Sequence, residues 1–498
     1  MITGIYMILK INGNVKPYYI QTLSMIFFPG VKFPEDEEET PDTLKATLDM
    51  TESETEVSAE VTICQGEKSC SAHESVKKGS HDDEKTRKIA AGSAFMKAGV
   101  MFTGFTPPWG ILTGVRPAKV ASELIENGRT PEEAAEEIER DYFVSPVKAK
   151  LAADVSVAEK KLITDSVRKE CSVYIGIPFC PTRCAYCSFV SYTSPGLIKL
   201  IPDYLTALER DIDGVFDIIR SLGMKVRSVY IGGGTPTILD ASQLDFLLSC
   251  VNKNTSGTEE FTLEAGRPDT ITADKLKVAY EHGVDRMSVN TQTMNDEVLK
   301  KIGRAHDSKM FLHAYEIAKK SGIKNINVDL IAGLPYDTTE SFKNSIDRVI
   351  ELDPENITVH TFSVKKSSEF KAEGMFDPAS VTAAESVDYS QTALAKGGYL
   401  PYYMYRQKNT VGNLENVGYS KPGHEGLYNV YMMEEVHSIF ASGASSVTKL
   451  VSLPDENGNV RIERFFRPKY PYEYLKDCAE EDYKLGELKK AAQEFFER

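Results

Sequence analysis

Short runs of β-branched and apolar residues alternate with helix-length amphipathic stretches over the middle of the chain. The strand-like runs are VYIGIPF (173–179), SVYIGGG (228–234), EFTLEAG (260–266), VDRMSVNTQT (284–293), NINVDLIAG (325–333) and ENITVHTFSV (355–364). Amphipathic stretches such as DYLTALERDIDGVFDIIRSL and ASQLDFLLSCV lie between them. This alternation is typical of βαβ units with a parallel sheet, so the sequence predicts an α/β fold. Six units predict a partial (β/α)6 barrel over 166–370, because a closed eightfold barrel needs two more.

The pattern on either side of this region is less regular. Apolar runs in residues 1–50 predict a small strand-containing domain, and its start, MITGIYMILKINGN, is interpreted as a strand rather than a signal peptide. Residues 51–88 are poor in large apolar side chains, so we expect a mobile polar insert there. Residues 89–165 predict a helical docking segment, in which TPEE (130–133) forms a capping box that opens an acidic helix. Residues 371–498, aromatic-rich around GYLPYYMYRQKN, predict a C-terminal domain that caps the barrel and the substrate.

The bulk composition narrows the classes of function. The chain has 498 residues and a formal net charge of −15, and it contains no apolar run long enough to cross a bilayer. We therefore expect a cytoplasmic protein, in which clustered cysteines bind metals or act in catalysis before they form disulfides. Binding to nucleic acid requires a basic face, and no Lys/Arg cluster with interleaved aromatic residues is present in the sequence. The composition therefore argues against a nucleic-acid partner.

Three cysteines lie within eight residues, in CPTRCAYC, directly after the first predicted barrel strand. The loops after barrel strands form the active face, so we expect Cys180, Cys184 and Cys187 there. A structural zinc takes four ligands, usually as two spaced pairs, and a CxxC disulfide accounts for only the last two cysteines. An iron–sulfur cluster with one open iron uses all three, and Tyr186 and Phe189 would shield it from water. The spacing favours the cluster over zinc without excluding zinc.

The cysteine motif resembles the CxxxCxxC signature of radical S-adenosylmethionine (SAM) enzymes, and the resemblance extends over about 170–450. YIGIPFCPTRCAYCSF, YIGGGTPT, RMSVNTQT, IGRAH and VDLIAGLPYDT are similar to the coproporphyrinogen dehydrogenase group of that superfamily. PWGILTGVRP and YYMYRQKNTVGNLENVGYSKPG resemble its HemZ subgroup. The resemblance implies a [4Fe–4S] cluster and SAM as cofactors, with Cys180, Cys184 and Cys187 as the cluster ligands.

The resemblance also implies a SAM pocket built from successive barrel units. Gly232, Gly233, Gly234 and Thr235 follow the second strand, at the turn where the family binds the methionyl amine; a plain strand-to-helix turn is the alternative. The resemblance assigns Arg304 to the methionyl carboxylate, Gln292 and Asp329 to the ribose side, and Tyr174 to the sulfonium. It places Glu264 in the same pocket. The alternative for these polar groups is mutual ion pairing inside the barrel mouth.

Other residues of types that often act in binding or catalysis are interpreted here as structural or are left with two interpretations. His306 is interpreted as a helix cap or surface residue and receives no role. Cys64 and Cys70, in the predicted insert, and Trp109, in the docking segment, are interpreted as structural. The tyrosines of GYLPYYMYR either line the pocket of a flat macrocycle or belong to the core.

The family reaction is the oxidative decarboxylation of two propionate side chains of coproporphyrinogen III to vinyl groups, which gives protoporphyrinogen IX without oxygen. It implies a porphyrinogen substrate, a one-electron donor and an electron acceptor. Two departures leave alternatives open, because Ser188 and Phe189 stand where the dehydrogenases have a further cysteine, and Gly176 where they have His. One alternative is a haem chaperone of the same fold, although the HNxxYW-like stretch of those proteins is missing; another tetrapyrrole substrate is the second. A radical enzyme that modifies RNA is disfavoured by the acidic charge.

Overall fold

The computed structural model describes residues 6–34, 39–79, 81–114, 116–187, 191–255, 257–363, 381–407, 410–456, 458–480 and 484–497. The chain divides into two compact units. Unit 1 contains the residues up to Val157 together with Met404–Glu415, and unit 2 begins at Ala158 and contains the barrel region, 382–403 and the residues from Asn416 onward. Within the described ranges, no helix is long and apolar enough to span a membrane.

Unit 1 contains a four-stranded sheet in the order β1-β2-β3-β4. Its strands are β1 (Met7–Asn12), β2 (Leu44–Glu52), β3 (Glu56–Gln65) and β4 (Lys68–Lys77); β1 runs parallel to β2, and the other pairs are antiparallel. Its helices are α1 (Pro17–Phe27), α2 (Asp83–Thr103), α3 (Ala118–Glu126), α4 (Pro131–Tyr142) and the start of α5 (Pro146–Leu162). The first strand and the TPEE capping box are confirmed, since Thr130 and Glu133 cap α4 and Pro131 begins it.

The prediction of a mobile insert over 51–88 is wrong, because most of this segment is paired strand. In β3, Val57, Ala59, Val61 and Ile63 alternate with polar residues and are fully buried on the side of the sheet that α2 covers. Small apolar side chains suffice here because α2 presents a face rich in alanine, which lets helix and sheet approach closely. The register pairs Cys64 with Ser69 and Ile63 with Cys70, so the two cysteines lie on opposite faces and do not share a site.

The residues 404–415 belong to unit 1 through a buried polar cluster. The indole Nε1 of Trp109 donates to Glu415 Oε2 at 2.7 Å, and Lys148 Nζ lies 2.7 Å from the other carboxylate oxygen. The Arg406 guanidinium lies over the Trp109 ring and donates to the carbonyl of Leu112 at 2.5 Å. Trp109, Lys148 and Glu415 are each no more than 1% exposed, so the structural interpretation of Trp109 agrees with its position.

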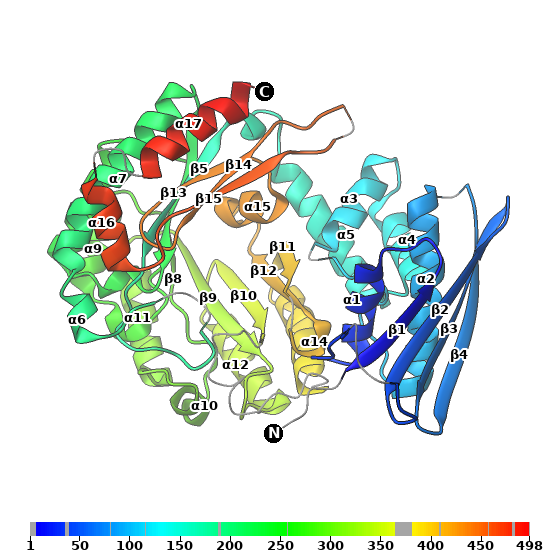
Figure 1. Ribbon diagram of the computed structural model, residues 1–498. Coiled ribbons are helices and arrows are strands. Elements are labelled where there is room, and N and C mark those ends of the chain that lie inside the picture. Colours follow the sequence, from blue (N-terminus) through cyan, green and yellow to red (C-terminus); the bar gives the residue numbers. More distant parts are fainter. Residues whose placement is uncertain are drawn as a thin grey trace. The chain divides into compact units, whose positions relative to one another are not determined.

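Unit 2 is organised by six parallel strands that follow each other in chain order across a curved sheet (Figure 1). They are β5 (Cys171–Ile177), β6 (Val226–Gly233), β7 (Glu260–Leu263), β8 (Arg286–Ser288), β9 (Asn325–Ala332) and β10 (Asn356–Thr361). Each overlaps one of the six runs expected from the sequence. The partial (β/α)6 barrel is therefore confirmed, and its C-terminal strand ends form one edge where the connecting loops meet.

Helices follow these strands in the expected alternation. They are α6 (Pro195–Ile198), α7 (Ile201–Ser221), α8 (Ala241–Asn252), α9 (Ala273–Glu281), α10 (Asp296–Lys301), α11 (Ser308–Lys320) and α12 (Thr339–Glu351). Short 3-10 turns lie at Val167–Lys169, Pro236–Ile238 and Pro268–Thr270, and a further one, Val411–Asn413, belongs to unit 1. In α7, the apolar residues recur at helical spacing, and Leu205, Leu208, Ile212 and Phe216 are buried.

The C-terminal residues of unit 2 do not form a compact unit of their own, which differs from the cap domain expected over 371–498. The strands β11 (Leu400–Arg406) and β12 (Glu415–Ser420) extend the sheet beyond β10, and β13 (Ser438–Ser442), β14 (Val447–Val451) and β15 (Ile462–Phe466) extend it beyond β5. The helices of this part are α14 (Val381–Lys396), α15 (Leu427–Glu434), α16 (Pro471–Ala479) and α17 (Lys484–Glu497). Tyr402 and Tyr403 are buried, as core residues are.

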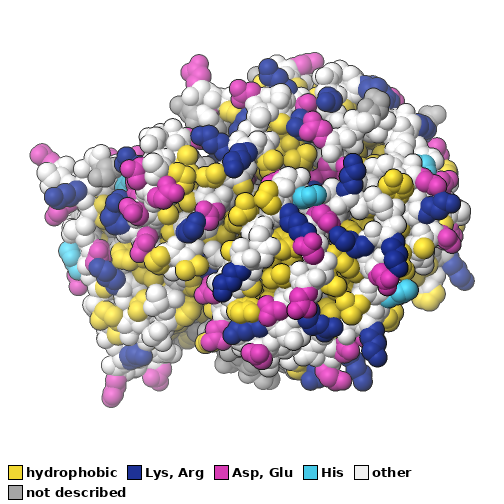
Figure 2. All heavy atoms as spheres, turned by 180° about the vertical axis from the view of Figure 1, so that it is seen from behind, with side chains coloured by type: hydrophobic (Ala, Val, Ile, Leu, Met, Phe, Trp, Pro, Cys, Tyr) yellow, Lys and Arg dark blue, Asp and Glu magenta, His cyan; other side chains and the backbone are white. Residues whose placement is uncertain are grey.

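The surface charges are mixed on the face shown in Figure 2, where Lys and Arg side chains are interspersed with Asp and Glu. No continuous basic patch is visible there among the residues that the structure describes.

Candidate functional site

The cysteine loop follows β5 directly and lies at the C-terminal edge of the barrel. Cys180 and Cys184 are buried and Cys187 is partly exposed, and all three are thiols rather than disulfides. The backbone N–H of Cys180 donates to the carbonyl of Tyr192 at 3.1 Å, which closes the loop at its base. Burial raises the pKa of the Cys180 thiol, partly offset by the Thr235 hydroxyl at 3.2 Å. Ser188 and Phe189 lie outside the described residues, so the expected shielding by Phe189 stays a prediction.

The glycine turn after β6 lies against this loop. Gly234 N–H donates to Ile177 carbonyl at 2.7 Å, and Thr235 N–H donates to Phe179 carbonyl at 2.8 Å. A Cβ atom on Gly234 would lie 2.5 Å from the Phe179 carbonyl oxygen, and Gly233 has a φ of 110°. Only glycine accommodates both constraints, because a side chain would collide with the backbone that carries the cysteines. The turn is therefore built for close approach of two backbones.

Glu264 projects into the barrel just after β7. Its Oε2 accepts from Gly233 N–H at 3.4 Å, and a Cβ atom on Gly232 would lie 2.6 Å from the same oxygen. Burial and the nearby Asp329 carboxylate raise the pKa of Glu264 to about 8. At neutral pH this carboxyl is therefore mostly protonated and can donate a hydrogen bond as well as accept one.

Asp329 on β9 is held by a polar network from the neighbouring strands. Asn290 Nδ2 donates to one of its oxygens at 2.8 Å, Asn327 Nδ2 donates to the other at 2.6 Å, and His360 Nε2 lies 3.6 Å away. Burial opposes ionisation of Asp329, but His360 and Asn327 outweigh it, so the pKa of this carboxyl is lowered. Asp329 is thus a fixed negative charge at the inner wall of the barrel.

Gln292 lies beside Asp329 in an unusual backbone conformation. Its φ is 70°, in the left-handed region that non-glycine residues rarely adopt. Its N–H donates to the Asp329 carbonyl at 2.9 Å, and its own carbonyl accepts from Ile331 N–H at 2.9 Å. Backbone strain that is held in this way is common at functional sites, so the position of Gln292 agrees with a binding role.

Arginine side chains approach the cysteine loop from two later units. Arg267 is buried; it donates to the Thr182 carbonyl at 3.1 Å and lies 3.9 Å from Cys184 Sγ, while Asp269 pairs with it through two hydrogen bonds. Arg304 lies near the Tyr186 ring and donates from Nη1 to the Gly266 carbonyl at 3.5 Å. Arg267 was missed from the sequence, although its place three residues after Glu264 at a strand end was a usable signal.

Three tyrosine rings stack inside the barrel. Tyr174 on β5 and Tyr230 on β6 are register partners with ring centroids 6.1 Å apart, and Tyr428 from α15 lies 4.6 Å from Tyr230. Glu260 on β7 accepts hydrogen bonds from Leu427 N–H and Tyr428 N–H, which fixes the start of α15 inside the curve of the sheet. Tyr174 was expected here, whereas nothing local in the sequence placed Tyr428 beside it.

The residues predicted from the sequence thus fall at one end of one barrel. The glycine turn contacts both the cysteine loop and Glu264, Glu264 and Asp329 interact electrostatically, and Arg304 stands beside Tyr186 of the loop. No three Cys, His, Asp or Glu side chains of the described ranges converge tightly enough to hold a single metal ion. The donors fit a cluster and SAM: three thiols on one loop, a turn without side chains, and a partly buried Arg304 whose buried Nε has no hydrogen-bond partner among the described residues.

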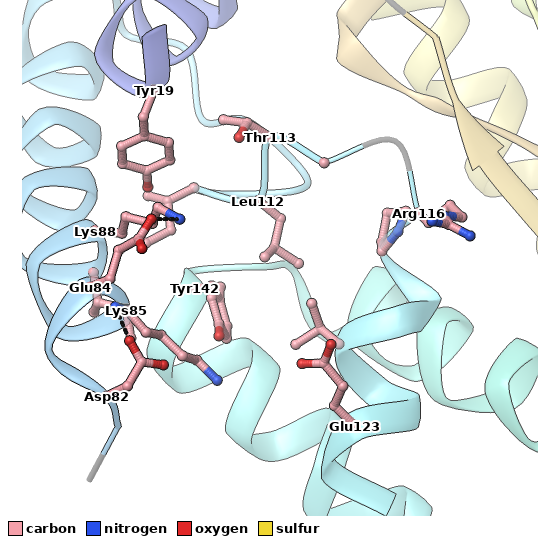
Figure 3. A pocket seen from close by; sticks show the side chains of 15 residues that line it. Tyr19, Asp82, Glu84, Lys85, Lys88, Leu112, Thr113, Arg116, Glu123 and Tyr142 are labelled. Atoms are coloured by element: carbon pink, nitrogen blue, oxygen red, sulfur yellow. Dashed lines mark hydrogen bonds and ion pairs between the residues drawn. The ribbon is translucent and has the colours of Figure 1, made fainter. Parts of the chain in front are cut away.

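A separate pocket of about 450 Å³ lies in unit 1, between α2, α3 and the segment around Leu112 (Figure 3). Arg116 lines it, together with Tyr19, Lys85 and Tyr142. Two of its acidic groups are engaged nearby, since Asp82 caps α2 and Glu84 pairs with Lys88, and Glu123 also lines it. Acidic and basic side chains are therefore both present in the lining.

Comparison with known proteins places this geometry in a family. The model of the radical SAM superfamily matches residues 174–349. The chain is 38% identical over 384 residues to the oxygen-independent coproporphyrinogen-III oxidase-like protein HemZ of Bacillus subtilis (strain 168), which covers 75% of each chain. It is 38% identical over 202 residues to the heme chaperone HemW of the same organism, which covers 40% of this chain and 52% of HemW.

Among solved structures, coproporphyrinogen III oxidase (HemN) from Escherichia coli, a radical SAM enzyme, matches with a TM-score of 0.50 and 24% identity over 63% of this chain and 70% of HemN. This likeness confirms the fold. Radical SAM proteins use a [4Fe–4S] cluster and SAM, so the cofactors expected from the cysteine motif are confirmed. Because three quarters of a HemZ protein is matched at 38% identity, the chain belongs to the radical SAM family of coproporphyrinogen-III oxidase-like proteins that includes HemZ.

Proposed function

We propose that the protein oxidatively decarboxylates two propionate side chains of coproporphyrinogen III to vinyl groups and so gives protoporphyrinogen IX without oxygen. The observation that carries the proposal is the meeting of the cysteine loop, the glycine turn and Glu264 at the C-terminal strand ends of the barrel. The similarity to HemZ and to HemN supports the choice of substrate.

In this proposal, the polar residues divide between the two cofactors. Cys180, Cys184 and Cys187 ligate the cluster. The backbone of Gly232–Gly234, with Thr235, receives the methionyl amine of SAM, and Arg304 receives its carboxylate. Gln292 and Asp329 bind the ribose side, Tyr174 borders the sulfonium, and Glu264 faces the amine. When bound, the cluster and SAM supply the one-electron chemistry that removes a hydrogen atom from an unactivated carbon.

The protein's own contribution is positioning and exclusion of water. Tyr174, Tyr230 and Tyr428 form an apolar floor beneath the site, and their burial raises the pKa of each phenol, so all three stay neutral. Asp329 supplies a fixed carboxylate, and Glu264 supplies a carboxyl whose proton is available near neutral pH. Each vinyl group requires loss of carbon dioxide, a hydrogen atom and one electron, so the reaction also needs an external one-electron donor and an acceptor.

A second candidate is a haem-delivery protein of the same family. The observation that favours it is the 38% identity to the heme chaperone HemW, which is confined to 202 residues. Stoichiometric binding of haem without decarboxylation would be its signature.

The deciding experiment is an anaerobic assay of the cluster-reconstituted protein with SAM, a strong reductant and coproporphyrinogen III. Mass spectrometry would follow 5′-deoxyadenosine and the porphyrin products together, and a haem titration would run in parallel. Loss of two carboxyl groups in step with 5′-deoxyadenosine is expected. Formation of 5′-deoxyadenosine without decarboxylation would remove this substrate, and haem binding with neither product would favour the delivery protein.

A further inference from the structure

The connection between α10 and α11 brings a second polar side chain to the place of Arg304. Residues 304–307 are neither helix nor strand, and Arg304 and His306 turn inward while Ala305 between them is exposed. His306 is only 4% exposed. The cap of α11 is Asp307, whose side chain accepts from Met310 N–H. The interpretation of His306 as a cap or surface residue is therefore wrong.

Part of the hydrogen-bonding capacity of this pair is left unused among the described residues, although Arg304 Nη1 donates to the Gly266 carbonyl. Within the described residues, the two ring nitrogens of His306 and the Nε of Arg304 lack a hydrogen-bond partner of ordinary geometry. The Thr291 backbone lies close to the imidazole. Buried polar atoms without partners are rare, and each costs free energy. Three such atoms at one place indicate that a ligand completes them.

The charge around the pair defines the ligand. Burial, followed by the Arg304 charge, lowers the pKa of His306 to about 4, so the ring is neutral and carries one N–H donor. Arg267 is already engaged by Asp269 and by the Thr182 carbonyl, which leaves Arg304 as the cation with an unused N–H. An N–H of the Arg304 guanidinium and an N–H of the neutral His306 ring can each donate to one oxygen of the same carboxylate.

We propose that His306 is a second donor, beside Arg304, to the methionyl carboxylate of SAM. The proposal rests on the assignment of Arg304 to that carboxylate in the proposed function. His306 touches the amino-acid half of SAM only, and a neutral imidazole does this without the like-charge repulsion that an imidazolium beside Arg304 would cause.

The test compares SAM with 5′-methylthioadenosine, which shares the adenosine half and lacks the amino acid. Dissociation constants would be measured anaerobically on the cluster-reconstituted full chain. The variants are His306→Leu, which removes both nitrogens at similar volume, and His306→Asn, which keeps an N–H donor. The matched control is His282→Leu, because His282 pairs with Asp245 on the surface at the end of α9.

His306→Leu is expected to weaken SAM about tenfold or more, as expected for a lost hydrogen bond to a charged group, and to leave 5′-methylthioadenosine unchanged. His306→Asn is expected to recover part of the SAM affinity, and His282→Leu to match the wild type. The electron paramagnetic resonance signal of the reduced cluster should need correspondingly more SAM for its ligand-induced shift in His306→Leu. These readouts do not follow from a structural role alone.

Unchanged SAM affinity in His306→Leu would overturn the proposal, and so would an equal weakening of both ligands, which indicates general damage to the barrel. Porphyrinogen is absent from these measurements, so a failure of the proposed reaction leaves the result intact. Conversely, decarboxylation of coproporphyrinogen III by His306→Leu with unchanged SAM affinity would retain the proposed function and remove this role of His306.

Discussion

At the scale of single residues, the side chains of the candidate site differ in how far the sequence alone identifies them. Spacing alone identifies Cys180, Cys184 and Cys187, because their ligand role depends on three nearby positions in the chain. His360 acquires its role from Asp329, which is distant in sequence, so no local pattern identifies it. Arg267 contacts the distant Thr182, but its place three residues after Glu264 at a strand end is a local signal. A site formed by neighbouring residues can be predicted from the sequence, whereas a site formed by residues from several strands can be identified only once the barrel is known.

Substitution of one predicted cluster ligand tests whether the thiols of the cysteine loop, and not the other thiols of the protein, hold the cluster. Cys184→Ala is expected to abolish retention of iron and sulfide after anaerobic reconstitution, because two remaining thiolates do not hold the cluster. Cys64→Ala is the matched control, since Cys64 lies on β3 of unit 1 and the cysteine loop belongs to unit 2. Iron and sulfide analysis with visible absorbance gives the answer; retention of a full cluster by Cys184→Ala would contradict the ligand assignment.

Glu264 gives a prediction on stability and pH. Its pKa in the folded protein, about 8, is raised above the ordinary carboxyl value, so between these two pH values the folded state holds a proton that the unfolded state has released. Stability relative to Glu264→Gln is therefore expected to fall as pH rises from 5 to 8, by roughly 2–4 kcal/mol, and to level off above that.

Urea unfolding of the SAM-free wild type and Glu264→Gln at several pH values would measure this difference, in which the other titrating groups largely cancel. A constant difference between the two proteins across this pH range would show that Glu264 is ionised throughout.

At the scale of elements, the glycine turn after β6 holds the segment that leads into the cysteine loop, through backbone hydrogen bonds to Ile177 and Phe179. Gly234→Ala places a Cβ atom 2.5 Å from the Phe179 carbonyl, so the backbone leading into Cys180 must shift. We expect a severalfold loss of cluster retention and a destabilisation of about 1–3 kcal/mol, as for other overpacked sites.

Gly196→Ala provides the control for this substitution, because a Cβ atom there meets no heavy atom within 4 Å and the backbone is not in the left-handed region. Cluster content and urea midpoints of the two variants would be compared in the same preparation. Equal behaviour of Gly234→Ala and Gly196→Ala would mean that the glycine turn and the cysteine loop can separate without consequence.

The elements also show where sequence patterns suffice and where they do not. The six barrel strands were predicted because buried parallel strands carry short apolar runs flanked by helices. The polar composition of 51–88 hides the strands β3 and β4, because Ser, Glu and Lys dominate the stretch although Val57, Ala59, Val61 and Ile63 alternate strictly with polar residues. The edge strand β4 has only polar residues on one face, and its other face contributes only the small or partly buried apolar residues Cys70, Ala72 and Val76, so its apolar signal is weak.

At the scale of the whole molecule, the division into units does not follow the order of the chain. Residues 404–415 belong to unit 1 although the segments on either side belong to unit 2. The domain boundaries expected from the sequence missed this return, because Glu415 and Lys148 are 267 residues apart and neither carries a local mark of burial. A buried ion pair between Lys148 and Glu415, with Trp109 hydrogen-bonded to the same carboxylate, holds residues 404–415 in unit 1.

This return predicts that residues 1–157 are incomplete as a folding unit. A fragment 1–157 keeps Lys148 and Trp109 but lacks Glu415 and Arg406, so a buried ammonium loses its counter-ion, at a cost of about 3–5 kcal/mol. Joining 404–415 to this fragment through a long Gly/Ser linker is expected to raise the midpoint of its thermal unfolding and to make that unfolding more cooperative. The same fusion with Glu415→Gln separates the charge from the added chain length, and it should recover only part of the gain. Cooperative melting of 1–157 at the temperature of the fusion would show that unit 1 folds without the returning segment.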